Sequence, residues 1–134
     1  MKAFSIPIRV YIEDTDAGGI VFYANYLKYM ERARTEWLRS FGIELDTWQE
    51  QLKTLFVVKA VNIEYASPAR FNDQLTAGFE LIKCKKASLQ CRQSIMRQDN
   101  QLSTALVTLV CVNADTMAPQ AIPKILIEAI SVEP

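Results

Sequence analysis

The 134-residue sequence contains no histidine. Without an imidazole the chain cannot form a Ser-His-Asp triad, a Cys-His nucleophile pair, a histidine-ligated zinc site or a histidine general base. It also has no apolar run near the roughly 20 residues that a membrane span requires. Any enzyme built on this chain must therefore move protons with other side chains, and no membrane span is expected.

Net charge is absent as well, because 15 Lys and Arg balance 15 Asp and Glu. A general binder of nucleic acid or of an anionic membrane normally has a basic excess, so we expect neither partner.

The sequence has an odd number of cysteines, namely Cys84, Cys91 and Cys111. They lack C-x-x-C spacing and lie in apolar or alternating stretches. This pattern favours small core residues of a reducing compartment over a redox pair or a metal site. With no signal-peptide pattern either, a cytoplasmic location is expected.

Residues 1–134 are predicted to form a single domain, because no repeat, low-complexity tract or Gly/Pro/Ser-rich linker divides them. Apolar residues recur with helical spacing from Asn25, and Gly42 is expected to end this helix as its C′ residue. An antiparallel sheet packed around this long helix would bury its apolar stripe, which predicts an α+β fold. Strands are expected at 6–12, 61–65, 75–81, 89–95 and 102–112, a hairpin turn at 97–101, and short helices at 46–52, capped by Asp46, and at 122–130, with Pro123 in the first turn.

The strongest chemical signal is the segment 14–26, which places two carboxylates, two glycines and three aromatics just before the long helix. The unpaired N–H groups and positive dipole end of a helix N-terminus suit a developing oxyanion. A carboxylate opposite them could attack a carbonyl or deprotonate water. In the alternative interpretation, Asp14 and Asp16 only form a turn, and Tyr23 and Tyr26 are core or interface aromatics.

The segments RVYIEDTDAGGIV (residues 9–21), NYL (25–27) and ERARTEWL (31–38) resemble the signature of the hotdog-fold acyl-CoA thioesterases related to 4-hydroxybenzoyl-CoA thioesterase. The chain is most similar to the bacterial subfamily whose gene commonly accompanies the Tol-Pal envelope system. Shorter matching segments extend the resemblance over nearly the whole chain. It implies a hotdog fold, an antiparallel sheet wrapped around one long central helix, and an enzyme that hydrolyses acyl-CoA to a free acid and coenzyme A.

The resemblance also implies the catalytic groups. Asp16, directly before Ala-Gly-Gly, falls on the family's essential carboxylate and would be the nucleophile or general base. Tyr23 falls on the position whose backbone N–H polarises the thioester carbonyl. Many members of the Tol-Pal-associated subfamily have histidine at that position. Backbone donation survives the change to tyrosine because any non-proline residue supplies an N–H, whereas proton transfer by an imidazole does not.

For coenzyme A itself, the resemblance implies that the region of Lys83, Lys85 and Lys86 faces the nucleotide and its phosphates, where charge-assisted contacts are favourable. Lys85 and Lys86 are the preferred contacts, and Ser88 is a weaker candidate. A solvated turn is the alternative for this cluster. Arg70 is a further candidate ligand residue, with a surface or interface ion pair as its alternative.

Two other polar features of the long helix have structural explanations. Asn25 is expected to cap the helix rather than to contact substrate. Glu31 and Arg34 lie three residues apart, so they are expected to pair with each other.

No metal and no cofactor are expected, apart from coenzyme A as part of the substrate. The resemblance implies a homo-oligomer, either a dimer with its sheets joined edge to edge and the site at the subunit boundary, or a tetramer built from two dimers. An acyl-carrier protein in place of coenzyme A stays open.

One rival function is that of an aromatic acyl-CoA hydrolase, which Phe22 and Tyr23 favour. The other is a non-catalytic acyl-CoA or acyl-carrier binding module in envelope or lipid metabolism, against which Asp16 argues. A dehydratase would ordinarily require a catalytic histidine.

Overall fold

The computed structural model describes residues 3–132. The element order is a strand, a long helix, a short helix, four strands and a terminal helix, as the sequence predicts. The strands are β1 (Phe4–Arg9), β2 (Thr54–Tyr65), β3 (Gln74–Cys84), β4 (Ser88–Arg97) and β5 (Asn100–Asn113); the helices are α1 (Asn25–Arg39), α2 (Leu45–Leu52) and α3 (Lys124–Val132), with a 3-10 turn, η1, at Ile12–Asp14.

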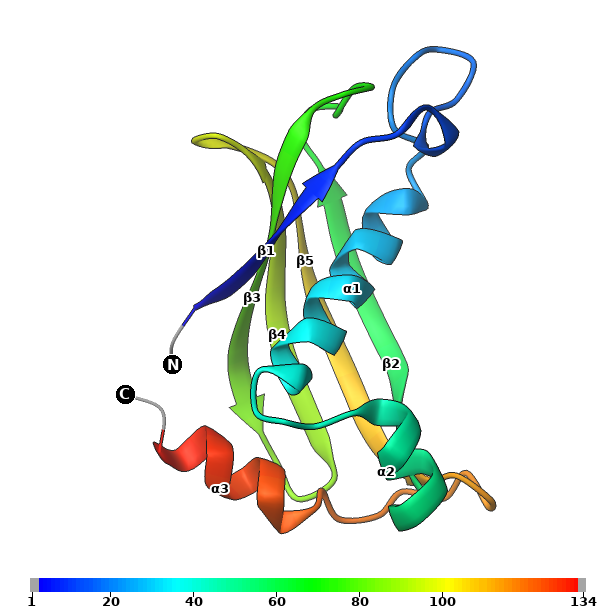
Figure 1. The fold of residues 1–134 in the computed structure, drawn as a ribbon, viewed down its shortest axis with the longest axis vertical. Coiled ribbons are helices and arrows are strands. Elements are labelled where there is room, and N and C mark those ends of the chain that lie inside the picture. Colours follow the sequence, from blue (N-terminus) through cyan, green and yellow to red (C-terminus); the bar gives the residue numbers. More distant parts are fainter. Residues whose placement is uncertain (1–2, 133–134) are drawn as a thin grey trace.

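The five strands form an antiparallel sheet in the order β1-β3-β4-β5-β2. Helix α1 lies across one face of this sheet (Figure 1). Strands β4 and β5 form the predicted hairpin, in which Arg97 pairs with Asn100. Strands β1 and β2 are the two edges. The predicted α+β architecture, an antiparallel sheet around one long helix, is therefore confirmed.

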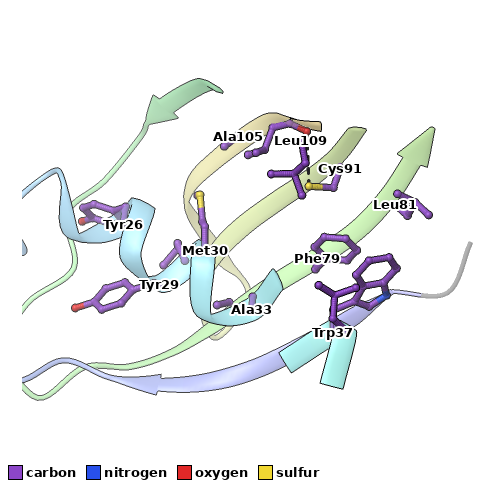
Figure 2. Packing of buried hydrophobic residues seen from close by; sticks show 14 of the residues in the cluster. Tyr26, Tyr29, Met30, Ala33, Trp37, Phe79, Leu81, Cys91, Ala105 and Leu109 are labelled. Carbon is purple, nitrogen blue, oxygen red and sulfur yellow. Dashed lines mark hydrogen bonds between the residues drawn. The ribbon is translucent and has the colours of Figure 1, made fainter. Parts of the chain in front are cut away.

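The apolar stripe of α1 forms the centre of the core. Met30, Ala33 and Trp37 are buried against residues that alternate along the strands. The Trp37 ring stacks on Phe79 of β3, with 4.3 Å between the ring centroids, and Figure 2 shows the two side chains together. Because these contacts fix α1 along the sheet, they also fix the position of its N-terminal end.

The sequence predicts the C-terminal end of α1 correctly but not the N-terminal end of α2. Gly42 has a φ of 80°, and its N–H donates to Arg39 O at 2.8 Å while Ile43 N–H donates to Leu38 O at 3.2 Å. This is the Schellman pattern, so the predicted C′ role of Gly42 is confirmed. The prediction that Asp46 caps α2 is wrong, because α2 already begins at Leu45 with Glu44 as the N-cap residue.

The edge strands also depart from their predicted limits. β1 ends at Arg9 instead of continuing to Ile12, because the chain turns into η1, where the Asp14 carboxylate accepts the Tyr11 N–H. β2 begins at Thr54 and carries a bulge between Val58 and Ala60. The bulge interrupts the alternation of side chains, so a period-two pattern reveals only the second half of the strand.

The three cysteines are unpaired, with Cys91 and Cys111 buried and Cys84 partly buried. Burial raises the pKa of the Cys91 thiol to about 12. These thiols fit the predicted role of small core residues. Among the described helices, none is long and apolar enough to cross a membrane.

Candidate active site

The Gly-rich loop before α1 is a closed hairpin. Asp16 N–H donates to Ile20 O at 2.9 Å, Gly19 N–H donates to Asp16 O at 3.0 Å, and Thr15 pairs with Val21 as an antiparallel bridge. Gly19 has a φ of 77°, a conformation that glycine adopts without the strain that a side chain would add. The hairpin therefore holds Asp16 at a defined place on the surface.

The Asp16 carboxylate is exposed and bonded on one side only. Its Oδ1 accepts the Gly18 N–H at 2.8 Å, and a Cβ at Gly18 would stand 3.2 Å from the same oxygen. Within residues 3–132, Oδ2 has no hydrogen-bond donor. One oxygen thus orients the carboxylate while the other is free to attack an electrophile or to accept a proton.

Helix α1 presents an open N-terminus beside this hairpin. Its N-cap residue is Ala24, and no side chain of the described residues caps it. The prediction that Asn25 is the cap is wrong. Asn25 is the first helical residue, it is buried, and its Nδ2 donates to Asp14 Oδ1 at 2.9 Å. Backbone carbonyls accept the Asn25 and Leu27 N–H groups, and no side chain of the described residues covers the positive end of the helix, so it is open to a ligand or solvent.

Tyr23 lies between the hairpin and this helix end. Phe22 N–H donates to Asp14 O at 2.9 Å, which joins the residue just before Tyr23 to the segment that carries Asp16. The Tyr23 N–H has no acceptor in the part of the chain that the structure describes. Its side chain is 65% exposed, and its carbonyl accepts the Tyr65 hydroxyl at 3.1 Å. Asp16 and the Tyr23 N–H therefore belong to one hydrogen-bonded unit.

Arg70 lies at the same end of the molecule. It pairs with Ile20 of the hairpin, and its N–H donates to Asp73 Oδ2 at 2.8 Å. Asp73 also forms an ion pair with Arg97 at 2.7 Å. Burial opposes ionisation of Asp73, but the bonds from Arg70 and Arg97 outweigh it and hold the pKa of Asp73 below its usual range. The Arg70 guanidinium itself has no carboxylate within 4.0 Å among the described residues.

Lys85, Lys86 and Ser88 lie at the opposite end. The two lysines are exposed in the turn between β3 and β4, and Lys85 N–H donates to Ser88 O at 2.8 Å. This turn and α3 border an open pocket of about 480 Å³ whose wall includes both lysines together with Ile122, Ile127 and Ile130. An apolar wall with two cations at its edge suits a ligand that carries both apolar and anionic groups.

The length of β3 separates these two groups of residues. β3 has 11 residues, and at about 3.3 Å per residue its ends lie roughly 33 Å apart. In Figure 1 the hairpin lies beside one end of the sheet, and the turn between β3 and β4 lies at the other, next to α3. The fold thus brings Asp16, Tyr23 and Arg70 to one end of a protomer and Lys85, Lys86 and Ser88 to the other.

Gln93, a polar residue that the sequence did not single out, lies buried against α1. Gln93 of β4 accepts from Arg34 at 2.9 Å and donates to Met30 O at 2.8 Å. Arg34 therefore reaches into the sheet, and the predicted pairing of Glu31 with Arg34 is absent among the described ion pairs. These contacts join residues far apart in the sequence, so no local pattern could reveal them.

Tyr29 is fully buried, and its hydroxyl has no hydrogen-bond partner in the described chain. Burial, reinforced by the negative charge of Asp14, raises the pKa of Tyr29. The tyrosine is therefore neutral at physiological pH and adds no charge near Asp14. Residues 3–132 contain no group of three His, Cys, Asp or Glu side chains placed to hold a metal ion.

Comparison with known proteins gives a consistent result. Residues 10–130 match the thioesterase-like superfamily. The chain is 44% identical over 123 residues to the acyl-CoA thioesterase YbgC of Haemophilus influenzae, covering 92% of this chain and 90% of that protein. It is 40% identical over 125 residues to the acyl-CoA thioester hydrolase YbgC of Escherichia coli, covering 92% of each.

Among solved structures, a probable thioesterase from Bartonella henselae matches with a TM-score of 0.87 and 29% identity, covering 91% of this chain and 100% of that chain. The match covers most of the chain, and this chain has the antiparallel sheet and long helix of that fold class, so the hotdog fold implied by the resemblance is confirmed. With its sequence matched along most of its length and its fold matched as well, the chain belongs to the thioesterase-like superfamily.

Proposed function

We propose that this protein hydrolyses acyl-CoA thioesters to a free carboxylic acid and coenzyme A, with Asp16 as nucleophile or general base. The observation that carries the proposal is the exposed Asp16 carboxylate, with one unbonded oxygen, on the same hydrogen-bonded unit as the open N-terminus of α1. Two relatives at 44% and 40% identity are named for this activity.

In the proposed reaction the thioester oxygen accepts the Tyr23 N–H, and the helix dipole stabilises the negative charge that develops on it. Asp16 then acts in one of two ways. As nucleophile it forms a mixed anhydride and expels the coenzyme A thiolate, and water cleaves the anhydride. As general base it takes a proton from water, which attacks the carbonyl carbon and displaces the thiolate. Either route consumes one water and yields the acid and the thiol.

The test is release of free thiol from acyl-CoA by the wild type and by Asp16→Asn. The asparagine can still accept the Gly18 N–H, so the loop turn is retained while the reactive carboxylate is lost. We expect kcat to fall by about 10²–10⁴-fold. Asp115→Asn, the same change in an exposed turn beyond β5, is the matched control and should keep the wild-type rate. Equal rates for wild type and Asp16→Asn would contradict the assignment.

A homo-oligomer would complete the substrate site under this proposal. β2 is an edge strand, with Val58 49% and Val61 40% exposed. Antiparallel pairing of two β2 strands would cover these residues and remove an open edge. It would also set the Lys85 and Lys86 end of one copy beside the Asp16 end of the other, so that lysines of a second copy could bind the coenzyme A phosphates, with Ser88 and Arg70 as further contacts. A dimer or a pair of dimers satisfies this arrangement.

We further propose that the protein acts in the cytoplasm, in lipid metabolism, alongside the Tol-Pal envelope system. Three unpaired cysteines and the sequence resemblance support this setting. An acyl-carrier protein in place of coenzyme A would present the same thioester to Asp16, so assays with both carriers separate the two substrates.

An aromatic acyl group is the second candidate substrate. The rings of Phe22 and Tyr23 lie 4.9 Å apart, and Tyr65 meets Tyr23 edge-on at 6.3 Å. Together they form an aromatic surface next to the helix end. Comparison of kcat/KM for short aliphatic, long aliphatic and hydroxybenzoyl thioesters distinguishes the two classes. Failure to release thiol from every member of this panel would favour the non-catalytic binding module.

A further inference from the structure

Each oxygen atom of Asp14 accepts a hydrogen bond inside the protein. Its Oδ1 accepts the Asn25 side-chain amide at 2.9 Å, and its Oδ2 accepts the Tyr11 N–H at 2.9 Å. Its backbone carbonyl accepts the Phe22 N–H at 2.9 Å. Hydrogen bonds to an ionised carboxylate are stronger than neutral ones. Asp14 is therefore bonded to three residues, one in its own turn and two at or just before the start of α1, unlike Asp16, which keeps a free oxygen.

These three bonds surround the two groups proposed to react. Asp16 follows Asp14 by two residues, and Tyr23 follows Phe22 directly. Asn25 is the first residue of α1 and is only 8% exposed. An unsatisfied amide at such a buried position is strongly unfavourable, so the contact between Asp14 and Asn25 resists opening. Through it, the hairpin that carries Asp16 is attached to the helix end that carries the Tyr23 N–H.

We propose that Asp14 is a positioning residue, which holds the Asp16 carboxylate and the Tyr23 N–H in register by binding Asn25 and the Tyr11 N–H at the same time. This inference rests on the proposed function. Both carboxylate oxygens of Asp14 are occupied, so its effect passes through the reacting groups and not through contact with substrate. A displacement of about 1 Å between such groups can lower a rate by about 10²-fold.

The first variant is Asp14→Ala. Alanine has no acceptor, so the Tyr11 N–H and the Asn25 amide both lose their partner on residue 14. We expect kcat to fall by about 10- to 100-fold, with KM within about threefold of wild type because the substrate contacts are retained. Asp115→Ala, the same change in an exposed turn, should leave both constants unchanged.

The second variant exchanges the two side chains, as Asp14→Asn combined with Asn25→Asp. The new amide oxygen can accept the Tyr11 N–H, and the new amide nitrogen can donate to the new carboxylate, so both hydrogen bonds return. The carboxylate also stays at the helix N-terminus, where the dipole favours it. We expect the exchange to restore kcat to within about threefold of wild type, a coupling that single variants cannot produce.

Each outcome decides the proposal. A wild-type kcat in Asp14→Ala overturns it. An exchange variant that regains its melting temperature but stays slow also overturns it, because the charge of Asp14 would then matter in itself. If the exchange variant does not fold, Asn25→Ala takes its place, and a wild-type kcat there overturns the proposal. If Asp16→Asn loses activity while the Asp14 variant keeps it, the proposed function stands and the role of Asp14 is wrong. If the wild type releases no thiol from acyl-CoA, the proposed function itself is wrong.

Discussion

At the Gln74 end of β3 the candidate catalytic groups are held by backbone hydrogen bonds, whereas at the Cys84 end two lysines extend from a tight turn into solvent. The hairpin around Asp16 is closed by bonds of 2.9 and 3.0 Å. The side chains of Lys85 and Lys86, by contrast, form no hydrogen bond or ion pair with the described residues.

This difference follows from what each end would have to do. Bond formation at a carbonyl carbon requires a nucleophile and a donor within a few tenths of an ångström of their places, and backbone bonds provide such rigidity. Attraction of phosphate depends on charge, which acts over a longer distance and tolerates long flexible side chains. The comparison predicts that changes at the first end alter kcat and that changes at the second alter KM.

Among the predictions from this comparison, the largest fall in kcat is expected for Tyr23→Pro, which tests whether the backbone N–H or the side chain of Tyr23 acts in the reaction. The Tyr23 N–H has no protein acceptor in the described chain, so proline removes the proposed oxyanion donor without breaking an internal bond. We expect kcat to fall by about 10²–10³-fold. Tyr23→Phe keeps the N–H and should stay close to wild type. A slow Tyr23→Phe with a normal Tyr23→Pro would transfer the role from the backbone to the hydroxyl.

A smaller effect is expected at the other end, from Lys85→Ala combined with Lys86→Ala. Loss of two phosphate contacts should raise KM by about 10-fold or more while kcat changes little. Lys124→Ala, an exposed cation on α3 outside the pocket wall, is the control.

Mixing this variant with Asp16→Asn sharpens the comparison. In a mixed dimer with shared sites, the intact Asp16 of one chain meets the intact lysines of the other, so activity at low substrate should exceed that of either variant alone. No gain on mixing, with subunit exchange shown by mass spectrometry, would mean that the lysines do not serve the partner's Asp16.

The smallest effect is expected for Asp73→Asn, which weakens the frame at the first end. The ion pair with Arg97 is partly exposed, so we expect a loss of about 1 kcal/mol and a fall in melting temperature of about 3–5 °C.

The sign of its pH dependence follows from the lowered pKa of Asp73. The folded state binds this proton less readily than the unfolded state, so the stabilisation is present above the usual carboxyl pKa of 3.8 and is lost as the pH falls through the folded value. The two melting curves should therefore differ at pH 7 and converge in acid. A difference that persists at pH 2 would assign it to packing.

The local elements of this fold follow from local sequence. The 3.6-residue period over Tyr26 to Trp37 predicts α1, and Gly42 marks the chain reversal after it. The predicted helix caps at Asn25 and Asp46 are wrong. Asp46 lies inside α2, which begins one residue earlier, at Leu45. A cap prediction assumes that a polar side chain bonds its own helix, but Asn25 finds Asp14, 11 residues away, once the hairpin folds against α1.

The sequence by itself determined the helix and strand pattern and the exclusion of imidazole chemistry, because each depends on residue type and short spacing. The choice of Asp16 and Tyr23 came from the resemblance of their segment to a known family. Only the tertiary structure decided that Asp14 binds Asn25, that Arg34 reaches Gln93, and that the lysines lie a full strand away from Asp16. Such contacts join distant parts of the chain. They arise when packing brings buried polar groups together and each must find a hydrogen-bond partner inside the protein.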